Sequence, residues 1–271
     1  MYLQHWRLDY SPFRTTIDAE RAYPSEALRE STARIEYLIA ERRRVGVLLG
    51  ERGAGKSVAL AVMQRRLQQS GAAACVVDAF GLSRRELLWQ VAEGIQAEPD
   101  PTDDEGRLWR RLSDRAQHLK WQGRDAVLMV DDVEQLGADL MRQLVRLLRI
   151  DPAPDSRWTV ILATDPARLS YLDDAVLHAI DLRIDLYPWT LDDTTGYLQN
   201  ALFEAGRLTP IFDDEAILRL FELTTGVPRH VVRLADFALL AGAGAGADSV
   251  DAGTVEQAFE EISWSPPVAA G

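Results

Sequence analysis

The sequence has 271 residues, with 42 acidic and 30 basic side chains and a formal net charge of −12. This charge disfavours a broad, sequence-independent contact with DNA or with an anionic membrane. The single cysteine, Cys75, excludes an internal disulfide and fits a reducing compartment. No apolar signal segment opens the chain and no apolar run is long enough to span a bilayer. We therefore expect a cytoplasmic protein that reaches a membrane only through a partner.

Residues 45–50, VGVLLG, predict a buried strand that ends in glycine, and residues 56–70 follow with helical spacing of apolar side chains. Between these segments GERGAGKS, residues 50–57, fits the phosphate-binding loop pattern G-x-x-x-x-G-K-[ST], also called Walker A. Strand, glycine-rich loop and helix form the context that this pattern requires. The residues predicted to bind the nucleotide here are Gly50, Glu51, Arg52, Gly53, Ala54, Gly55, Lys56, Ser57 and Val58.

The composition of this loop indicates how it would bind a triphosphate. The glycines allow successive backbone N–H groups to curl around the phosphates at the start of the helix, where the helix dipole also favours an anion. Lys56 would reach the β- and γ-phosphates, and the hydroxyl of Ser57 would bind Mg²⁺.

Strands and helices continue to alternate after the loop. Further strands are predicted over 73–79, 126–132, 158–165 and 180–187. A capping box of Ser83 with Glu86 begins one intervening helix, a second covers 106–121, and a third follows residue 135. The acidic, proline-containing segment 98–105 is predicted to be a solvated loop. The order predicts an α/β fold of the P-loop NTPase type, with a parallel five-stranded sheet flanked by helices.

The strands stop after Pro188, and helical patterns occupy the remainder of the chain. We therefore expect two domains: a nucleotide-binding α/β domain over 1–188, whose first 44 residues are a lead-in, and a small all-helical lid domain over 189–271. The Gly-Ala run at 242–247 predicts a flexible loop between two lid helices.

The third predicted strand, AVLMVDD, supplies carboxylates next to the phosphate site. Asp131 ends the apolar run and is predicted to bind Mg²⁺. Asp132 follows at the position that would polarise the attacking water, and Glu134 is an alternative for that role. Aspartate is one methylene shorter than glutamate, and position errors of about 1 Å can lower a rate 10²-fold. Hydrolysis can therefore be slow.

Two further polar residues are candidates for the same site. Thr164 ends the fourth strand, where its hydroxyl could sense the γ-phosphate beside Asp131. Arg229 lies near the start of a helix in the predicted lid domain and could link nucleotide state to lid position.

Four segments of the sequence resemble a known family. They are YSPF (10–13), the phosphate-binding loop with the helix before it, LMVDDVEQL (128–136) and TGVPRHVVRLADFALL (225–240). Together they resemble the AAA+ ATPases, and more narrowly the general secretion pathway protein A group. The resemblance implies a 5-1-4-3-2 parallel sheet, ATP as the nucleotide, and assembly into homo-oligomers, either dimers or rings. It also implies that Pro12 and Phe13 lie near the adenine and that Arg229 is the second sensor.

The sequence departs from that family at three positions. Asp132 stands where the family has glutamate, and Asp78 stands where it usually has asparagine. Of two arginines expected in HAIDLRIDLYPW, the first position is Ala179, so that only Arg183 remains as a candidate arginine finger. An arginine finger raises kcat by roughly 10³–10⁵-fold, so its loss would lower the rate of hydrolysis strongly.

These features favour an ATPase that hydrolyses Mg–ATP to drive a conformational change on a protein partner, in secretion or pilus assembly by analogy with the relatives. One alternative is a switch that binds ATP and hydrolyses little of it. Another is an accessory ATPase in transposition or DNA handling, which the net charge of −12 disfavours.

Overall fold

The computed structural model describes residues 2–14 and 16–262. The chain divides into two compact units. The larger unit is Ile17–Tyr187, and the smaller unit combines the N-terminal residues up to Thr16 with the residues from Pro188 onward. Among the described residues, the strands are confined to the larger unit.

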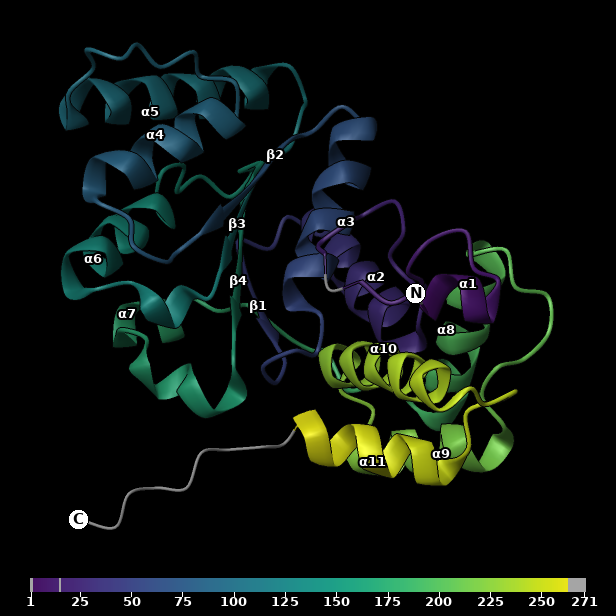
Figure 1. Cartoon of the computed structure of the whole chain (residues 1–271). Helices are drawn as coiled ribbons and strands as arrows, with labels where there is room; N and C mark the ends of the chain where they lie inside the picture. The colour runs from purple at the N-terminus through teal and green to yellow at the C-terminus, as the bar shows by residue number, and fades with distance from the viewer. Residues whose placement is uncertain (1, 15, 263–271) are drawn as a thin grey trace. The chain divides into compact units, whose positions relative to one another are not determined.

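The larger unit is built on a five-stranded parallel sheet (Figure 1). Its strands lie in the order β2-β3-β4-β1-β5, which confirms both the predicted α/β fold and the strand order implied by the family resemblance. The five strands are β1 (Val45–Leu49), β2 (Ala73–Asp78), β3 (Ala126–Asp131), β4 (Trp158–Thr164) and β5 (Leu182–Asp185). Because β1 lies between β4 and β5, the loop that follows β1 leaves from within the sheet and not from its edge.

Helices cover both faces of this sheet. Side chains alternate between the two faces along each strand, so that neighbouring residues of one strand pack against different helices. Val47 and Leu49 join a core with the helices α4, α5 and α6, whereas Leu48 joins a core with α2 and α3. These two groups of helices lie on opposite sides of the sheet (Figure 1). The helices of the larger unit are α2 (Glu26–Ala40), α3 (Lys56–Gln69), α4 (Arg84–Gly94), α5 (Glu105–Trp121), α6 (Ala138–Leu147) and α7 (Asp174–Leu177), with short 3-10 helices η1 (Val133–Gln135) and η2 (Pro166–Tyr171). The capping box predicted at the start of α4 is confirmed, with Ser83 and Glu86 as its members.

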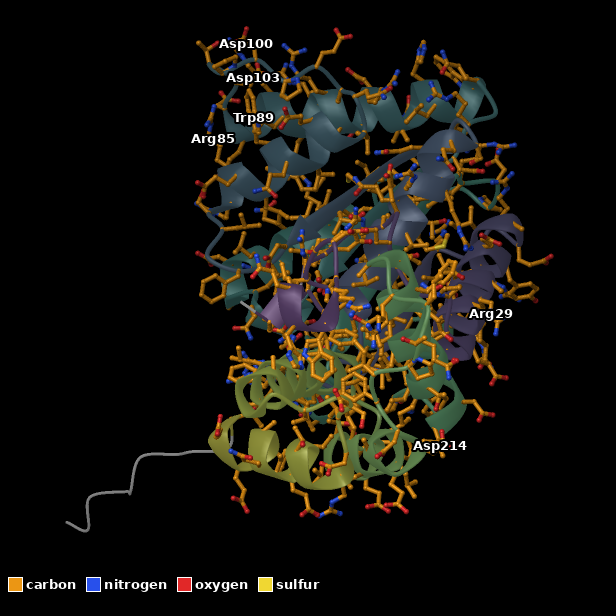
Figure 2. The ribbon with its side chains drawn as sticks, turned by 45° about the vertical axis from the view of Figure 1, so that its right-hand side comes forward. Arg29, Arg85, Trp89, Asp100, Asp103 and Asp214 are labelled. Carbon is orange, nitrogen blue, oxygen red and sulfur yellow. The ribbon has the colours of Figure 1, made fainter. Side chains whose placement is uncertain are left out.

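The acidic segment before α5 is more ordered than a solvated loop. Arg85 and Trp89 of α4 lie beside Asp100 and Asp103 (Figure 2). Arg85 donates hydrogen bonds to the carbonyl oxygens of Pro101 and Asp103, at 2.6 and 3.1 Å. The carboxylate of Asp103 is buried and accepts from the backbone N–H of Asp100 and from a nearby arginine. The segment is a loop, as expected, but one of its carboxylates, that of Asp103, is buried and hydrogen bonded within the protein instead of being solvated.

The smaller unit is all helical in its described part. It comprises α1 (Tyr2–Trp6), α8 (Leu191–Glu204), α9 (Asp214–Thr224), α10 (Pro228–Ala245) and α11 (Ala252–Ile262). Trp6 is buried in its core, and the indole N–H donates a 2.8 Å hydrogen bond to the carbonyl oxygen of Leu239. Phe13 joins the same core. The sequence placed these N-terminal residues in the lead-in of the nucleotide-binding domain, whereas their side chains complete the core of the smaller unit.

The prediction of a flexible loop over 242–247 was wrong for most of that run. Helix α10 continues to Ala245 and ends at Gly246, whose φ of +69° is the left-handed conformation common after a helix. Gly242 lies against Trp6, and a β-carbon placed there would approach the indole Cζ2 to 2.9 Å. Small residues at this point therefore serve close packing of α1 on α10.

Within the described residues, every helix is too short or too polar to cross a membrane.

Candidate nucleotide-binding site

The phosphate-binding loop connects β1 to α3 in a backbone conformation that only its glycines adopt easily. Gly53 and Gly55 have φ values of +93° and +103°, and Gly55 is the N-cap of α3. A β-carbon on Gly50 would approach the carbonyl oxygen of Leu186 to 3.1 Å. These contacts restrict the loop to glycine at both ends, and the backbone N–H groups at the start of a helix, which have no partner within the helix, are suited to bind an anion.

Lys56 lies inside this loop. Its side chain is buried, at 7% exposed, and its ammonium donates hydrogen bonds to the carbonyl oxygens of Gly50 at 2.9 Å and Glu51 at 3.3 Å. An ammonium has three protons, so that two of them close the loop and one remains for another acceptor. A buried cation of this kind is stabilised further by an anion such as a phosphate.

The candidate metal ligands meet at the end of β3. Asp131 is buried, and burial raises the pKa of its carboxyl above the ordinary value, with the charge of Asp132 adding to the effect. A hydrogen bond with Ser57 and the charge of Lys56 oppose this rise in pKa. A hydroxyl and a carboxylate are the hard oxygen donors that Mg²⁺ prefers, and a cation would offset the burial of the charge. The pair therefore fits Mg²⁺ shared with a nucleotide. In the described part of the chain no group of three or more His, Cys, Asp or Glu side chains could hold a metal alone.

The two candidates for orienting water differ sharply in their surroundings. Asp132 is exposed, with its backbone in the left-handed conformation at φ 48° and ψ 45°. Glu134 belongs to η1, and its side chain is only 5% exposed. The carboxylate Oε2 of Glu134 accepts a hydrogen bond of 2.8 Å from the hydroxyl of Thr164.

Thr164 is itself tied to the phosphate-binding loop. It is fully buried at the end of β4 and lies opposite Leu49, the last residue of β1. The backbone N–H of Gly50 donates to the carbonyl oxygen of Thr164 at 3.2 Å. The structure therefore joins Thr164, Glu134 and the first residue of the loop in one hydrogen-bonded set.

Arg183, the candidate arginine finger, is bound by its own strand. Its Nε and Nη2 donate to the carboxylate of Asp185 at 2.8–3.1 Å. The arginine side chain is 63% exposed, so this pair lies at the surface of β5. A finger role would require Arg183 to exchange Asp185 for a phosphate, and it stays a prediction.

Three predicted residues belong to the smaller unit. Phe13 is buried there between Tyr197 and Phe212, with ring centroids 6.0 and 6.1 Å away, and Pro12 precedes it. Arg229 is exposed on the first turn of α10. Their proximity to the adenine and to the phosphates stays a prediction.

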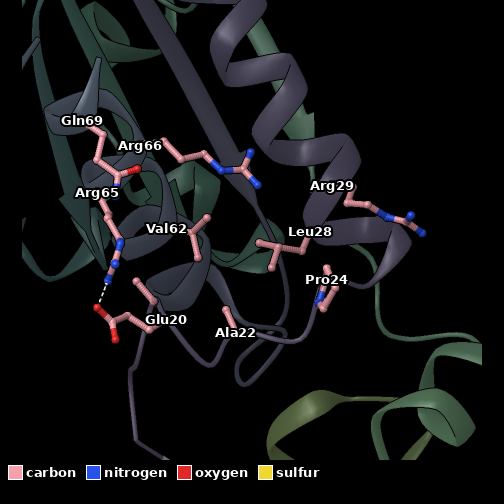
Figure 3. A pocket seen from close by; sticks show the side chains of 10 residues that line it. Glu20, Ala22, Pro24, Leu28, Arg29, Val62, Arg65, Arg66 and Gln69 are labelled. Atoms are coloured by element: carbon pink, nitrogen blue, oxygen red, sulfur yellow. Dashed lines mark hydrogen bonds and ion pairs between the residues drawn. The ribbon is translucent and has the colours of Figure 1, made fainter. Parts of the chain in front are cut away.

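A hollow of about 370 Å³ lies between α2, α3 and the segment before α2 (Figure 3). It contacts α3 only from Val62 onward, which is about 9 Å along the helix from Lys56. Two of its arginines already have carboxylate partners, Arg65 with Glu20 and Arg66 with Glu36 (Figure 3 shows the first pair). The hollow is therefore separate from the phosphate-binding loop.

One residue at the site was not predicted from the sequence. Arg168, in η2, places its Nη1 3.9 Å from Oε1 of Glu134, and so approaches the carboxylate oxygen that Thr164 leaves free. Asp165 followed by Pro166 is a pattern typical of the start of a helix, and it could have indicated η2. No local pattern in the sequence, however, indicates that Arg168 of this helix lies near Glu134.

Comparison with known proteins supports the family resemblance. Residues 39–172, which run from the end of α2 through η2, match the family described as AAA domain. This part of the chain is therefore similar to an AAA domain. It is also 26% identical to General secretion pathway protein A of Aeromonas hydrophila over 267 residues, which is 97% of this chain and 49% of that protein. The resemblance predicted from the four sequence segments is confirmed, and the chain spans about half the length of this relative.

Solved structures show the same fold at lower identity. The Aeropyrum pernix Orc1 protein, in complex with DNA, superposes with a TM-score of 0.69 at 17% identity, covering 94% of this chain and 69% of that one. The Thermotoga maritima RuvB Holliday junction branch migration motor superposes with a TM-score of 0.60 at 13% identity, covering 93% and 74%. These similarities support the fold described above.

Proposed function

We propose that this chain binds ATP with Mg²⁺ in the loop over residues 50–57 and hydrolyses it to ADP and phosphate. The observation that carries the proposal is the buried ammonium of Lys56, which is bound to the Gly50 and Glu51 carbonyl oxygens at the start of α3. This arrangement concentrates backbone N–H donors and one cation on a single point, which a polyphosphate would occupy.

The residues of this chain have separate tasks in the proposed reaction. Lys56 and the loop N–H groups bind the β- and γ-phosphates and stabilise charge that develops on them. Ser57 and Asp131 would hold Mg²⁺, which when bound neutralises phosphate charge. Thr164 donates a hydrogen bond to Glu134 and so orients its carboxylate.

We assign the orientation of the attacking water to Glu134 in preference to Asp132. A group that positions water must itself have a fixed position, and Glu134 is buried and hydrogen bonded. Asp132 occupies the expected position in the sequence, but its side chain is exposed. The longer glutamate, two residues further on, therefore supports hydrolysis despite the aspartate at position 132.

The work performed by the reaction is proposed from the resemblance. Because the relative is General secretion pathway protein A, we propose a protein partner of the secretion or pilus type, a cytoplasmic location, and homo-oligomers with Arg183 and Arg229 as nucleotide-responsive residues. The net charge of −12 disfavours DNA as the partner, although the Orc1 structure of similar fold contains DNA.

The test compares the wild-type chain with Lys56→Ala. We expect labelled ATP to bind the wild type in the presence of Mg²⁺ and to raise its unfolding temperature, because a ligand that binds only the folded state stabilises it. Lys56→Ala should lose both effects. Equal ATP binding by the two proteins would overturn the proposal. A turnover number that climbs with protein concentration would support the proposed oligomer.

A switch that binds ATP but hydrolyses little of it is the second candidate. The exposed Asp132, at the position where the family has glutamate, favours it. Asp132→Glu separates the two functions: a large gain in kcat would indicate a switch of reduced activity, whereas an unchanged kcat would support Glu134 as the working residue.

A further inference from the structure

The carboxylate of Glu134 has two polar partners in the described part of the chain, Thr164 and Arg168, and only Thr164 was predicted from the sequence as a site residue. Thr164 donates to Oε2 at 2.8 Å, and the guanidinium of Arg168 lies 3.9 Å from Oε1. A hydroxyl has a single proton, so that Thr164 can fix only one carboxylate oxygen. The other oxygen, Oε1, is the one that the guanidinium of Arg168 approaches.

Arg168 is held at this point by a rigid local structure. β4 ends at Thr164, and Asp165 then caps η2 by accepting a hydrogen bond of 2.9 Å from Ala167. Pro166 fixes the first turn, and the backbone N–H of Arg168 donates to the carbonyl oxygen of Asp165 at 2.9 Å. The backbone of Arg168 therefore belongs to the same short segment as Thr164.

The two partners of Glu134 differ in exposure. Thr164 is fully buried, whereas the side chain of Arg168 is 47% exposed and reaches the carboxylate from the solvent side. A half-exposed ion pair adds little to folding stability. Its effect on the direction of a buried carboxylate can be large in a reaction, because catalysis is sensitive to shifts of about 1 Å.

We propose that Arg168 is a positioning residue for ATP hydrolysis, which acts by holding Oε1 of Glu134 while Thr164 holds Oε2. This inference rests on the proposed function and deepens it. Arg168 acts through Glu134, so its removal should alter the chemical step and leave ground-state ATP binding intact.

The experiment measures kcat and KM for phosphate release by the full chain with Mg–ATP. We expect Arg168→Ala to lower kcat about tenfold, within the 10²-fold that a misplacement of about 1 Å can cost, and to leave KM nearly unchanged. Arg168→Lys keeps the positive charge and should recover part of the loss. The matched control is Arg142→Ala, which removes an exposed arginine paired with Asp139 on α6 and should leave both constants unchanged.

A double-mutant cycle with Glu134→Gln measures whether the two substitutions are coupled in the rate of hydrolysis. A residue with only a structural role would show no such coupling. If Arg168 acts through Glu134, adding Arg168→Ala to Glu134→Gln should lower single-turnover hydrolysis no further. Independent, multiplicative losses would overturn the inference. So would an unchanged kcat in Arg168→Ala, or a raised KM with kcat intact.

The failure of this inference can be distinguished from failure of the proposed function. A wild-type chain whose turnover does not depend on Lys56 would overturn both. Lys56-dependent turnover that is insensitive to Arg168→Ala would overturn only the role of Arg168.

Discussion

The hydroxyl of Thr164 lies 2.8 Å from the carboxylate of Glu134, although 30 residues separate them in the chain. The contact joins the end of β4 to η1, the short helix that follows β3. Neighbouring parallel strands bring their carboxyl ends to the same edge of a sheet, so that residues from two strands form one site. This relationship favours Glu134 over Asp132 for the reaction and leads to the first two predictions.

Glu134→Gln should lower kcat by about 10²-fold, the lower end of what a positioned acid or base contributes. Glutamine keeps the size of the side chain but cannot accept a proton from water. Asp132→Asn is the matched control and should leave kcat nearly unchanged, because Asp132 is exposed. Phosphate-release assays on both variants check the prediction, and the reverse ranking would return the role to Asp132.

Thr164→Val should destabilise the folded chain by about 1–3 kcal/mol, since it leaves the buried carboxylate of Glu134 without its hydroxyl donor. Thr164→Ser keeps the hydroxyl and should lose less. Urea unfolding of the two variants measures the difference. An unchanged free energy of unfolding in Thr164→Val would show that the hydroxyl of Thr164 does not stabilise this region.

Gly94→Ala should also be destabilising, by about 1–3 kcal/mol, because overpacked cores must shift to accept new atoms. A β-carbon on Gly94 of α4 would lie 2.1 Å from the β-carbon of Cys75 in β2. Gly244→Ala in α10 is the control: nothing lies within 4 Å of the added carbon, and alanine favours helix by up to about 1 kcal/mol. Opposite signs in urea unfolding are expected, and a stabilising Gly94→Ala would contradict the packing of α4 on β2.

Cys75 should resist thiol reagents in the folded chain. Burial raises the pKa of its thiol from 9.0 to about 12, so almost no thiolate exists at pH 8. The sign of the effect on stability follows: between pH 9 and 12 the unfolded chain releases this proton first, and the free energy of unfolding falls as pH rises. An aromatic disulfide reagent at pH 8 should label the chain rapidly in concentrated urea and slowly without it. Fast native labelling would show that Cys75 is accessible.

The sheet and the phosphate-binding loop could be predicted from the sequence because both depend on local information. VGVLLG has the length and composition of a buried strand, and the observed β1 covers Val45–Leu49. Asp131 could be placed at the end of β3 for the same reason, since the apolar run before it ends there.

The remaining features depend on contacts between residues far apart in the sequence. The choice of Glu134 over Asp132 required the position of Thr164, and Arg168 required the direction of η2. The Gly-Ala run has the composition of a linker, but packing against Trp6 makes most of it helical. Composition alone gives no sign of that partner.

The hydrogen bond from Trp6 to Leu239 has a consequence for biosynthesis. The two residues are 233 positions apart, and at roughly 5–20 residues per second the ribosome needs on the order of tens of seconds to cover that interval. During this time the indole has no native core to enter, and an apolar segment stays exposed to water and to any chaperone that meets it. The core of the smaller unit can close only after Leu239 has been made, whereas the larger unit, Ile17–Tyr187, can already have formed by then.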